Sequence, residues 1–153
     1  MIALLFDVDG QRYGLDIRQI VEIVPAVRLR RLPSLPPYVA GVCRFRGAYV
    51  PVLDLSLLIA GVPAAERLST RLVLVRHPGP AGEGRILGLL AEHAAQGLDE
   101  QTDAPSSTGV ASPEAPYLGP LTASGGRTVQ HVRVEQLLPL AVRERLFSEA
   151  ERA

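Results

Sequence analysis

Three short turns, each between segments of alternating apolar and polar residues, constrain this 153-residue chain most strongly. Asp9-Gly10 follows "IALLFDV", Arg46-Gly47 follows "GVCRF", and Gly125-Gly126 follows "YLGPLTAS". A two-residue hairpin turn demands positive φ, which glycine tolerates, and strict alternation is the period of a strand with one buried face. The sequence therefore predicts three β-hairpins spread along the whole chain.

Two internal segments are predicted to be short helices. Residues 17–24 carry apolar side chains at the i, i+3, i+4, i+7 spacing of a buried helix face, with Asp16 as N-cap and Pro25 as the end. The apolar positions are Ile17, Ile20, Val21 and Val24. The stretch "DLSLLIAG" is predicted as a second helix, capped by Asp54 and closed by Gly61.

The second half of the chain adds more strands and a terminal helix. Residues 70–76 and 85–92 are predicted as paired strands, and residues 99–116, rich in Pro and Ser, as a mobile loop. A helix is expected to open on Pro139, and its apolar side is formed by Leu138, Val142 and Leu146. About seven strands in hairpins, without repeated βαβ units, predict a mainly β fold built from small antiparallel barrels.

Charge and cysteine content narrow the functional classes. The chain has 16 basic and 16 acidic residues, so its overall charge favours neither nucleic acid nor a membrane surface as partner. Cys43 is the only cysteine, which excludes an internal disulfide and fits a reducing compartment. An acid at Asp7 comes too early for a signal peptide, and no apolar run reaches the ~18 residues of a membrane span. We expect a cytoplasmic protein with no direct membrane insertion.

No constellation typical of catalysis is visible in the sequence. His77, His93 and His131 are too far apart to form a metal-ligand motif, and we expect the first two at the surface. There is no nucleotide-binding glycine motif, and "DVDG" is a turn rather than a calcium loop. Cys43 follows Val42 in an apolar strand, which favours a buried structural thiol. The residues therefore favour a binding module over an enzyme, with neither cofactor nor metal.

Two groups of arginines are each either ordinary solvent-exposed charges or part of a binding site. Arg28 and Arg30 alternate with apolar residues in an extended segment, and such a patch could bind phosphate. Because neither a glycine-rich loop nor an aromatic platform accompanies it, a solvated strand face is favoured. Arg44 and Arg46 lie one strand step apart beside a hairpin turn, where they are either solvated charges or a docking site.

Several blocks together resemble a known family. These are "FDVDGQRYGLDIRQIVEIV", "LPSLPPYVAGVCRFRGAYVPVLDL", "TRLVLV" and "GLLAE". In order and spacing they resemble the CheW-like domain of bacterial chemosensory systems, over nearly the whole chain. The stretch from Tyr13 to Leu55 carries both the Y-G-[IL]-D-I and the G-V-x-x-x-R-G-x-x-[VI]-P-V-x-D-L signatures, whereas "GLLAEHAAQ" matches the family less well.

The resemblance implies a fold and a function. It implies two small five-stranded β-barrels packed side by side as a single domain over residues 1–153, with no catalysis. Members of the family are adaptors that couple the cytoplasmic tips of methyl-accepting chemoreceptors to a CheA-type histidine kinase. The kinase has a regulatory domain of the same fold, whose barrels pack on the adaptor through hydrophobic faces, while the receptor hairpin lies in a groove. The chain would then reach membrane receptor arrays through its partners.

The resemblance also implies partner-binding residues. Arg46 and Gly47 fall on the last two positions of the family's N-L-R-G motif, whereas Arg44 replaces its Asn and Phe45 its Leu. Glu22 falls on a characteristic acid that could orient Arg46 through a charge-assisted hydrogen bond, unless it is only a helix-surface acid. The predicted partner-binding residues are Ile20, Glu22, Arg44, Phe45, Arg46 and Gly47.

The departure at Arg44 leaves the choice of partners open, because Asn satisfies nearby backbone groups whereas Arg reaches outward. The segments "LSTRLVLV" and "VRERLF" resemble the corresponding sequences of adaptors in chemosensory systems that control surface-associated growth through a diguanylate cyclase response regulator. Two rival interpretations are a free-standing regulatory lobe related to a chemotaxis kinase and a small β-barrel enzyme or ligand-binding protein. The second would need a polar constellation inside a pocket.

Overall fold

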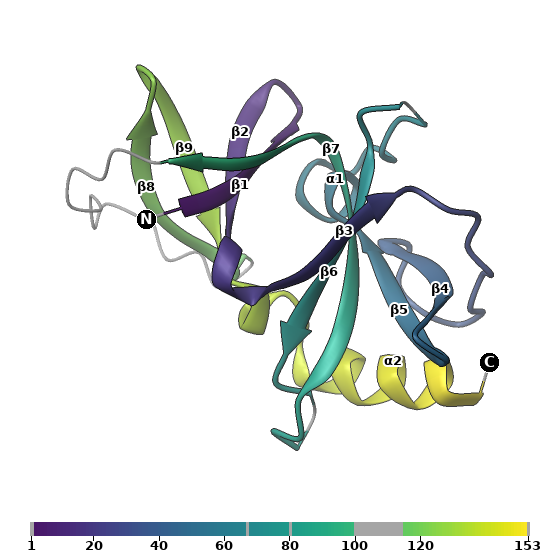
Figure 1. Cartoon of the computed structure of the whole chain (residues 1–153). Helices are drawn as coiled ribbons and strands as arrows, with labels where there is room; N and C mark the ends of the chain where they lie inside the picture. Colours follow the sequence, from purple (N-terminus) through teal and green to yellow (C-terminus); the bar gives the residue numbers. More distant parts are fainter. Residues whose placement is uncertain (1, 67, 80, 100–114, 153) are drawn as a thin grey trace.

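The computed structural model describes residues 2–66, 68–79, 81–99 and 115–152, and this part of the chain is mainly β (Figure 1). The strands are β1 (Ile2–Val8), β2 (Gln11–Asp16), β3 (Ile20–Pro25), β4 (Val39–Phe45), β5 (Ala48–Asp54), β6 (Arg71–His77), β7 (Arg85–Asp99), β8 (Leu118–Ser124) and β9 (Arg127–Val132). The helices are α1 (Leu55–Ala60) and α2 (Leu140–Arg152), with 3-10 turns η1 (Ile17–Gln19) and η2 (Val134–Gln136). The mobile loop predicted at 99–116 falls almost entirely outside the described residues.

All three predicted hairpins are present. Strands β1 and β2, β4 and β5, and β8 and β9 pair antiparallel. Both residues of each connecting turn have positive φ, as a two-residue hairpin turn demands. The local turn chemistry therefore determines where the chain reverses.

Strand β7 joins two five-stranded groups. Its first half pairs with β5 and β6, which continue to β4 and β3, and its second half pairs with β1, which continues through β2 and β9 to β8. The mainly β class is confirmed, with more strands than the seven expected from sequence. Among the described residues the pairing runs from β3 to β8 without closing either group. An isolated bridge between Arg30 and Val42 links the segment after β3 to β4.

Two pairings are parallel, which hairpins alone do not explain. Strand β5 runs parallel to β7 from Val52 onward, and β2 runs parallel to β9. Pro51 has no backbone N–H. It lies opposite Val42 in the ladder with β4, and the parallel ladder with β7 begins at Val52, the residue after it. Gly88 lies opposite Val52, where an added Cβ would stand 2.9 Å from Val52 Cγ2. A side chain at that position would push β5 away from β7.

The helix predicted for residues 17–24 is wrong. Asp16 does act as an N-cap, accepting a hydrogen bond from the backbone N–H of Arg18 (2.9 Å), but the helical turn ends after Gln19 and β3 follows. The register of β3 against β6 shifts between Ile20 and Glu22, which marks a β-bulge. A bulge adds one residue to the strand and breaks its period of two. The interrupted alternation produced an apolar spacing that imitates a helix.

The hydrophobic core lies on both faces of β6 and β7. One face joins the main cluster with β1 and η2, and the opposite face joins a smaller cluster with Cys43 of β4. Strands buried on both sides read as continuous apolar runs, which explains "LVLV" and "LGLL". The β6 and β7 residues in the main cluster are Val73, Val75, Leu87, Leu89 and Ala91. Leu72 and Leu74 of β6 belong to the smaller cluster, together with Val52 of β5.

The two other predicted helices, the one between Asp54 and Gly61 and the one after Pro139, are confirmed. Asp54 accepts a hydrogen bond from the Leu57 N–H (3.2 Å), and Gly61 closes α1 in the left-handed conformation. Helix α2 runs along the lower part of Figure 1, beside the lower end of β5, and the β6–β7 hairpin reaches below it. Its predicted apolar side packs on the main cluster through Leu146 and Val142, with Leu138 just before the helix. Within the described residues no helix has the length and apolar character needed to cross a membrane.

Candidate functional site

The turn between β4 and β5 is the centre of the candidate site. Arg46 has φ 50° and Gly47 φ 81°. Positive φ is common for glycine but uncommon for a side chain as large as arginine. The Arg46 guanidinium carbon stands 4.7 Å from the centroid of the Phe45 ring, a cation–π distance. Strict alternation along β4 would put Arg46 on the face opposite Phe45, but the turn rotates Arg46 out of that alternation and over the ring.

This turn forms one wall of a groove of about 600 Å³. The β4–β5 hairpin contributes residues 45–51, the start of β7 contributes residues 84–86, and α2 contributes Phe147 and Glu151. Three of the predicted partner-binding residues therefore line one groove: Phe45, Arg46 and Gly47. Aromatic rings with arginines beside them are typical of the centre of protein interfaces.

The opposite wall is held together by Arg85. Its guanidinium contacts Glu151 at 2.5 Å, lies 5.0 Å from the centroid of the Phe147 ring, and is 4.0 Å from Glu83. These contacts fix the last turns of α2 to the β6–β7 hairpin. The groove thus has an arginine stacked on a phenylalanine at each wall, one from the hairpin and one joining β7 to α2.

His77 is buried behind this wall of the groove and packs against Phe147. The sequence analysis had expected it at the surface, but the residue is only 1% exposed because α2 covers it. Its ring centroid lies 5.7 Å from that of Phe147, and its Nδ1 accepts a hydrogen bond from the Gly79 N–H (2.9 Å). Burial and the nearby Arg143 lower the pKa of His77 from 6.5 to about 4, so the ring is neutral at pH 7.

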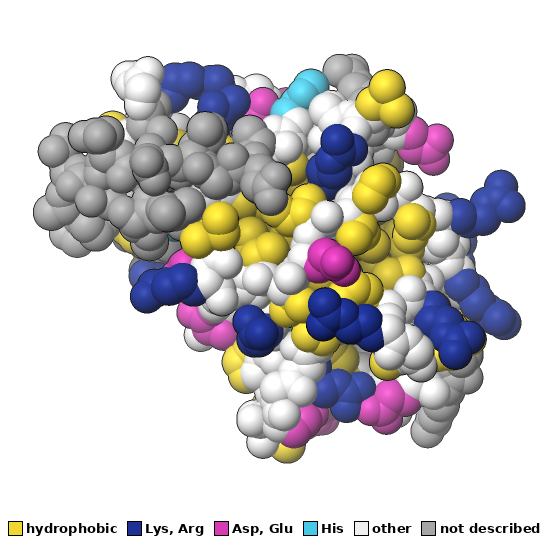
Figure 2. All heavy atoms as spheres, in the orientation of Figure 1, with side chains coloured by type: hydrophobic (Ala, Val, Ile, Leu, Met, Phe, Trp, Pro, Cys, Tyr) yellow, Lys and Arg dark blue, Asp and Glu magenta, His cyan; other side chains and the backbone are white. Residues whose placement is uncertain are grey.

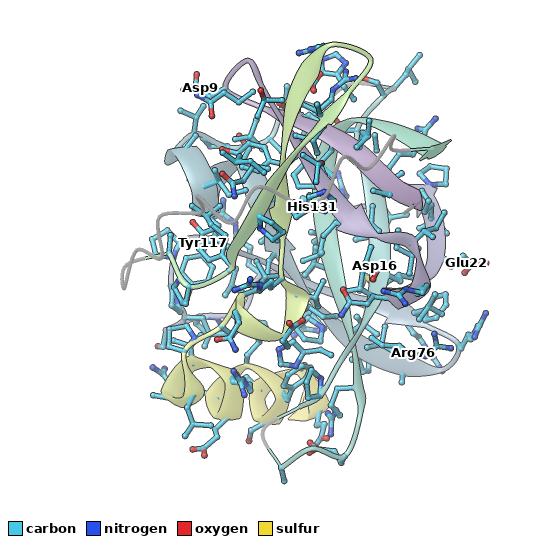
Figure 3. All side chains as sticks on the ribbon, turned by 90° about the vertical axis from the view of Figure 1, so that its left-hand side faces the viewer. Asp9, Asp16, Glu22, Arg76, Tyr117 and His131 are labelled. Carbon is cyan, nitrogen blue, oxygen red and sulfur yellow. The ribbon has the colours of Figure 1, made fainter. Side chains whose placement is uncertain are left out.

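The other predicted residues lie outside this groove. Arg44 is exposed on β4, opposite Tyr49 of β5, and Ile20 is half-buried against the main core cluster. Glu22 is exposed on β3 and projects from the right-hand edge of Figure 3, and Arg76 of β6, also exposed, lies below it in this view. Among the described residues Glu22 forms no ion pair with Arg46, so the orienting contact expected between them is not formed.

Sequence reasoning missed the contribution of α2 and β7. Phe147, Glu151 and Arg85 approach the hairpin only through tertiary packing, and no local motif marks them. The sole available signal was Phe147 beside the apolar stripe that ends at Leu146, where a large aromatic widens the buried face toward β5. A contact of this kind depends on where the helix crosses the sheet.

The described residues show no arrangement suited to catalysis or metal binding. No group of three or more His, Cys, Asp or Glu side chains is placed to hold a metal ion. Cys43 is buried as expected, and burial raises the pKa of its thiol, which disfavours the reactive thiolate. His131 is also buried and lies 2.9 Å from the Thr122 hydroxyl (Figure 3). The surface around the hairpin is therefore the feature to compare with known proteins.

A family model described as "CheW-like domain" matches residues 3–142. The chain belongs to the CheW-like domain family. Proteins named "Chemotaxis protein CheW" from Klebsiella aerogenes and Helicobacter pylori are each 27% identical in sequence to this chain. The alignments cover 88% of this chain and 80% of the first protein, and 87% of this chain and 78% of the second. The crystal structure of the scaffolding protein TtCheW from Thermoanaerobacter tengcongensis superposes with a TM-score of 0.79. It is 17% identical and covers 94% of this chain and 95% of its own.

Proposed function

We propose that this CheW-like protein is a non-catalytic adaptor that couples chemoreceptors to a CheA-type histidine kinase in a chemosensory complex. The main support is family membership over residues 3–142, combined with an arginine held at the β4–β5 turn beside an open groove. The relatives named chemotaxis protein CheW and the scaffolding protein TtCheW support the same role. The rival interpretation as an enzyme gains no support from the polar groups described above.

The geometry of the turn suits a docking residue. Arg46 and Gly47 are fixed by the two-residue turn, and the Phe45 ring holds the guanidinium in place. A pre-positioned guanidinium loses little conformational freedom when it binds a carboxylate, and its planar fork can donate two parallel hydrogen bonds. We therefore propose that the partner contacts Arg46 directly, with Phe45 and the groove beside it.

The partners follow from the same proposal. They are the cytoplasmic tip of a methyl-accepting chemoreceptor and the regulatory domain of the kinase, and the protein acts in the cytoplasm at receptor arrays. Nucleic acid is not among the proposed partners. The narrower resemblance to adaptors of surface-associated growth remains a prediction from sequence.

A binding experiment on purified variants tests this function. The wild-type chain should retain both a chemoreceptor cytoplasmic fragment and a kinase regulatory domain in a pull-down. Arg46→Ala should weaken binding to at least one of them by about 2 kcal/mol, or roughly 30-fold, because a truncated interface arginine leaves its partner unpaired. Arg46→Lys should restore little, since lysine lacks the fork.

The control is Arg127→Ala, an exposed arginine that follows the turn of the β8–β9 hairpin. Arg127→Ala should leave binding unchanged. The free energy of unfolding of both variants, measured by denaturant titration, should stay within about 1 kcal/mol of the wild-type value, because exposed charges contribute little to stability. Retention of neither partner by the wild-type chain would refute the adaptor function. Equal binding by Arg46→Ala and wild type would leave Arg46 as a solvated turn residue.

A further inference from the structure

A second hollow lies at the end of β5 that is farthest from the β4–β5 turn. Its volume is about 690 Å³, and its lining comes from the segment after β3, the segment after α1 and the middle of β7: residues 26–29, 64–66, 68, 70 and 90. Asp54, the last residue of β5, accepts a hydrogen bond from the backbone N–H of Ala64 (2.9 Å). The hollow shares no lining residue with the groove of Arg46, so it is a separate surface.

Both walls of this hollow are held in place by hydrogen bonds. On the side after α1, the Ala65 N–H donates to the Glu92 carboxylate of β7, and the Thr70 hydroxyl donates to the Ala65 carbonyl (2.6 Å). On the side after β3, Arg30 exchanges two backbone hydrogen bonds of 3.0 and 2.8 Å with Val42 of β4. The shape of the hollow is therefore built into the fold.

Apolar side chains stand unprotected at the rim of the hollow. Leu68 is 94% exposed, although the Arg71 guanidinium donates a hydrogen bond to its carbonyl, and Val27 on the opposite wall is 50% exposed. Yellow side chains are visible in the upper right part of Figure 2, where the loop after α1 and the end of β3 lie in Figure 1. Leu68 gains almost nothing from burial in the isolated chain. Exposed apolar side chains gathered beside a hollow are typical of a surface that another protein covers.

The two walls carry opposite charges. Among the described residues that line the hollow, the charged ones are Arg28 on the side after β3 and Glu66 on the side after α1. Both side chains are exposed, and neither takes part in the ion pairs formed by the described residues. An occupant that matches this surface must bring an acid to Arg28, a base to Glu66 and an apolar side chain to the hollow. The surface itself carries all three.

We propose that a second copy of this chain covers the hollow, so that the surface is the interface of a two-fold symmetric dimer. In such an interface a surface meets its own copy turned by 180°, and the wall after β3 of one copy faces the wall after α1 of the other. Leu68 of each copy then enters the hollow of the other, and Arg28 comes opposite Glu66 of the partner subunit. The groove of Arg46 stays open in this dimer, because the two surfaces share no residue.

Sedimentation equilibrium of the purified full chain tests the dimer. The wild type should dimerise with a dissociation constant below about 100 μM. Leu68→Glu should raise this constant at least about tenfold, because it brings a charge into an apolar hollow. The matched control is Leu140→Glu, which alters another exposed leucine at the start of α2 and should change the constant by less than about twofold. Circular dichroism should show wild-type folding for both variants, since both leucines are exposed.

Charge reversal tests the pairing across the two-fold axis. Arg28→Glu and Glu66→Arg should each raise the dissociation constant at least about fivefold at low salt, because like charges then face each other twice in the dimer. The double variant Arg28→Glu with Glu66→Arg restores opposite charges at both contacts. Its dissociation constant should return to within about threefold of the wild-type value.

Three results would overturn the inference. A wild type that stays monomeric up to about 200 μM has no such dimer. A dimer that Leu68→Glu leaves intact has its interface elsewhere, and a double variant that does not recover lacks the proposed pairing. If the chain is monomeric and Leu68→Glu loses a chemoreceptor fragment or a kinase regulatory domain in a pull-down, the hollow belongs to that protein instead. The adaptor function is tested separately, by the wild type's retention of those two partners.

Discussion

The β1–β2 and β4–β5 hairpins share one backbone geometry but differ in chemistry. Their turns have nearly the same φ angles, 50° and 75° at Asp9 and Gly10 against 50° and 81° at Arg46 and Gly47. Two residues before the first turn, Asp7 pairs with Arg12 at 3.1 Å across the strands. At the equivalent positions of the second hairpin Arg44 faces Tyr49, and among the described residues it forms no ion pair.

The difference separates a hairpin suited to its own fold from one suited to a partner. Aspartate tolerates left-handed backbone and occurs often in such turns, whereas arginine has no local reason to occupy one. A cross-strand ion pair stabilises the first hairpin, and the second leaves its charges available. A residue that violates a local rule, as Arg46 does in this turn, is expected at a functional site. Four predictions test this contrast, from the largest effect to the smallest.

The largest difference in the free energy of unfolding is expected between alanine variants of the phenylalanines in the two hairpins. Phe6 is fully buried in β1, with its ring 5.7 Å from that of Tyr13, whereas Phe45 is only half-buried. Phe6→Ala should reduce the free energy of unfolding by about 3–5 kcal/mol, because it empties a packed core site. Phe45→Ala should cost less than about 2 kcal/mol and instead weaken partner binding. Urea titration of both variants measures the contrast, and equal losses would contradict it.

Acid should loosen the wall beside the second hairpin before the first hairpin is affected. The pKa of His77 is about 4 in the folded chain against about 6.5 when unfolded. Between these values the unfolded state binds a proton that the folded state refuses, so stability is full above pH 6.5 and falls as the pH drops toward 4. The loss should reach about 2–3 kcal/mol. His77→Gln should flatten the stability profile between pH 6.5 and 4.

The other acid-sensitive group, Asp16, should not affect stability between pH 6.5 and 4. The hydrogen bond from Arg18 lowers the pKa of Asp16 below its usual 3.8, so the stability this carboxylate contributes is lost only at still lower pH. Hydrogen exchange followed by mass spectrometry at pH 5 should show faster exchange in α2 than in β1. Uniform acceleration over both elements would mean that His77 does not act on the α2 wall.

The comparison also shows what sequence could and could not predict. The hairpins were predictable because their turns are decided by two adjacent residues, such as Asp9 and Gly10, whose backbone preferences act locally. The apolar spacing of residues 17–24 predicts a helix where β3 begins, because the bulge at the start of β3 arises from pairing with β6, and the sequence alone does not reveal that pairing. Arg46 was found as a motif residue, but its contact with the Phe45 ring depends on the turn geometry. Phe147 and Arg85 depended on helix packing.

Relaxing the second turn should stabilise the chain. Arg46→Asn places at positive φ a residue that tolerates the left-handed region, so the free energy of unfolding should rise by about 0.5–1 kcal/mol. Asp9→Asn exchanges two residues suited to the same geometry and should change it by less than about 0.5 kcal/mol. Thermal unfolding of both variants tests this. A destabilised Arg46→Asn would show that the contact with Phe45 outweighs the backbone strain.

The smallest effect concerns the charges that flank the two turns. Arg12→Ala removes the partly exposed ion pair with Asp7 and should cost about 0.2–1 kcal/mol, a loss that shrinks in high salt. Arg44→Ala removes an exposed charge that forms no ion pair within the described part of the chain, so stability should stay level at low and high salt. A matched pair of urea titrations at low and high salt reads both effects. If Arg44→Ala proves as costly as Arg12→Ala, then Arg44 stabilises its own hairpin through Tyr49, and the proposed division between a folding hairpin and a docking hairpin does not hold.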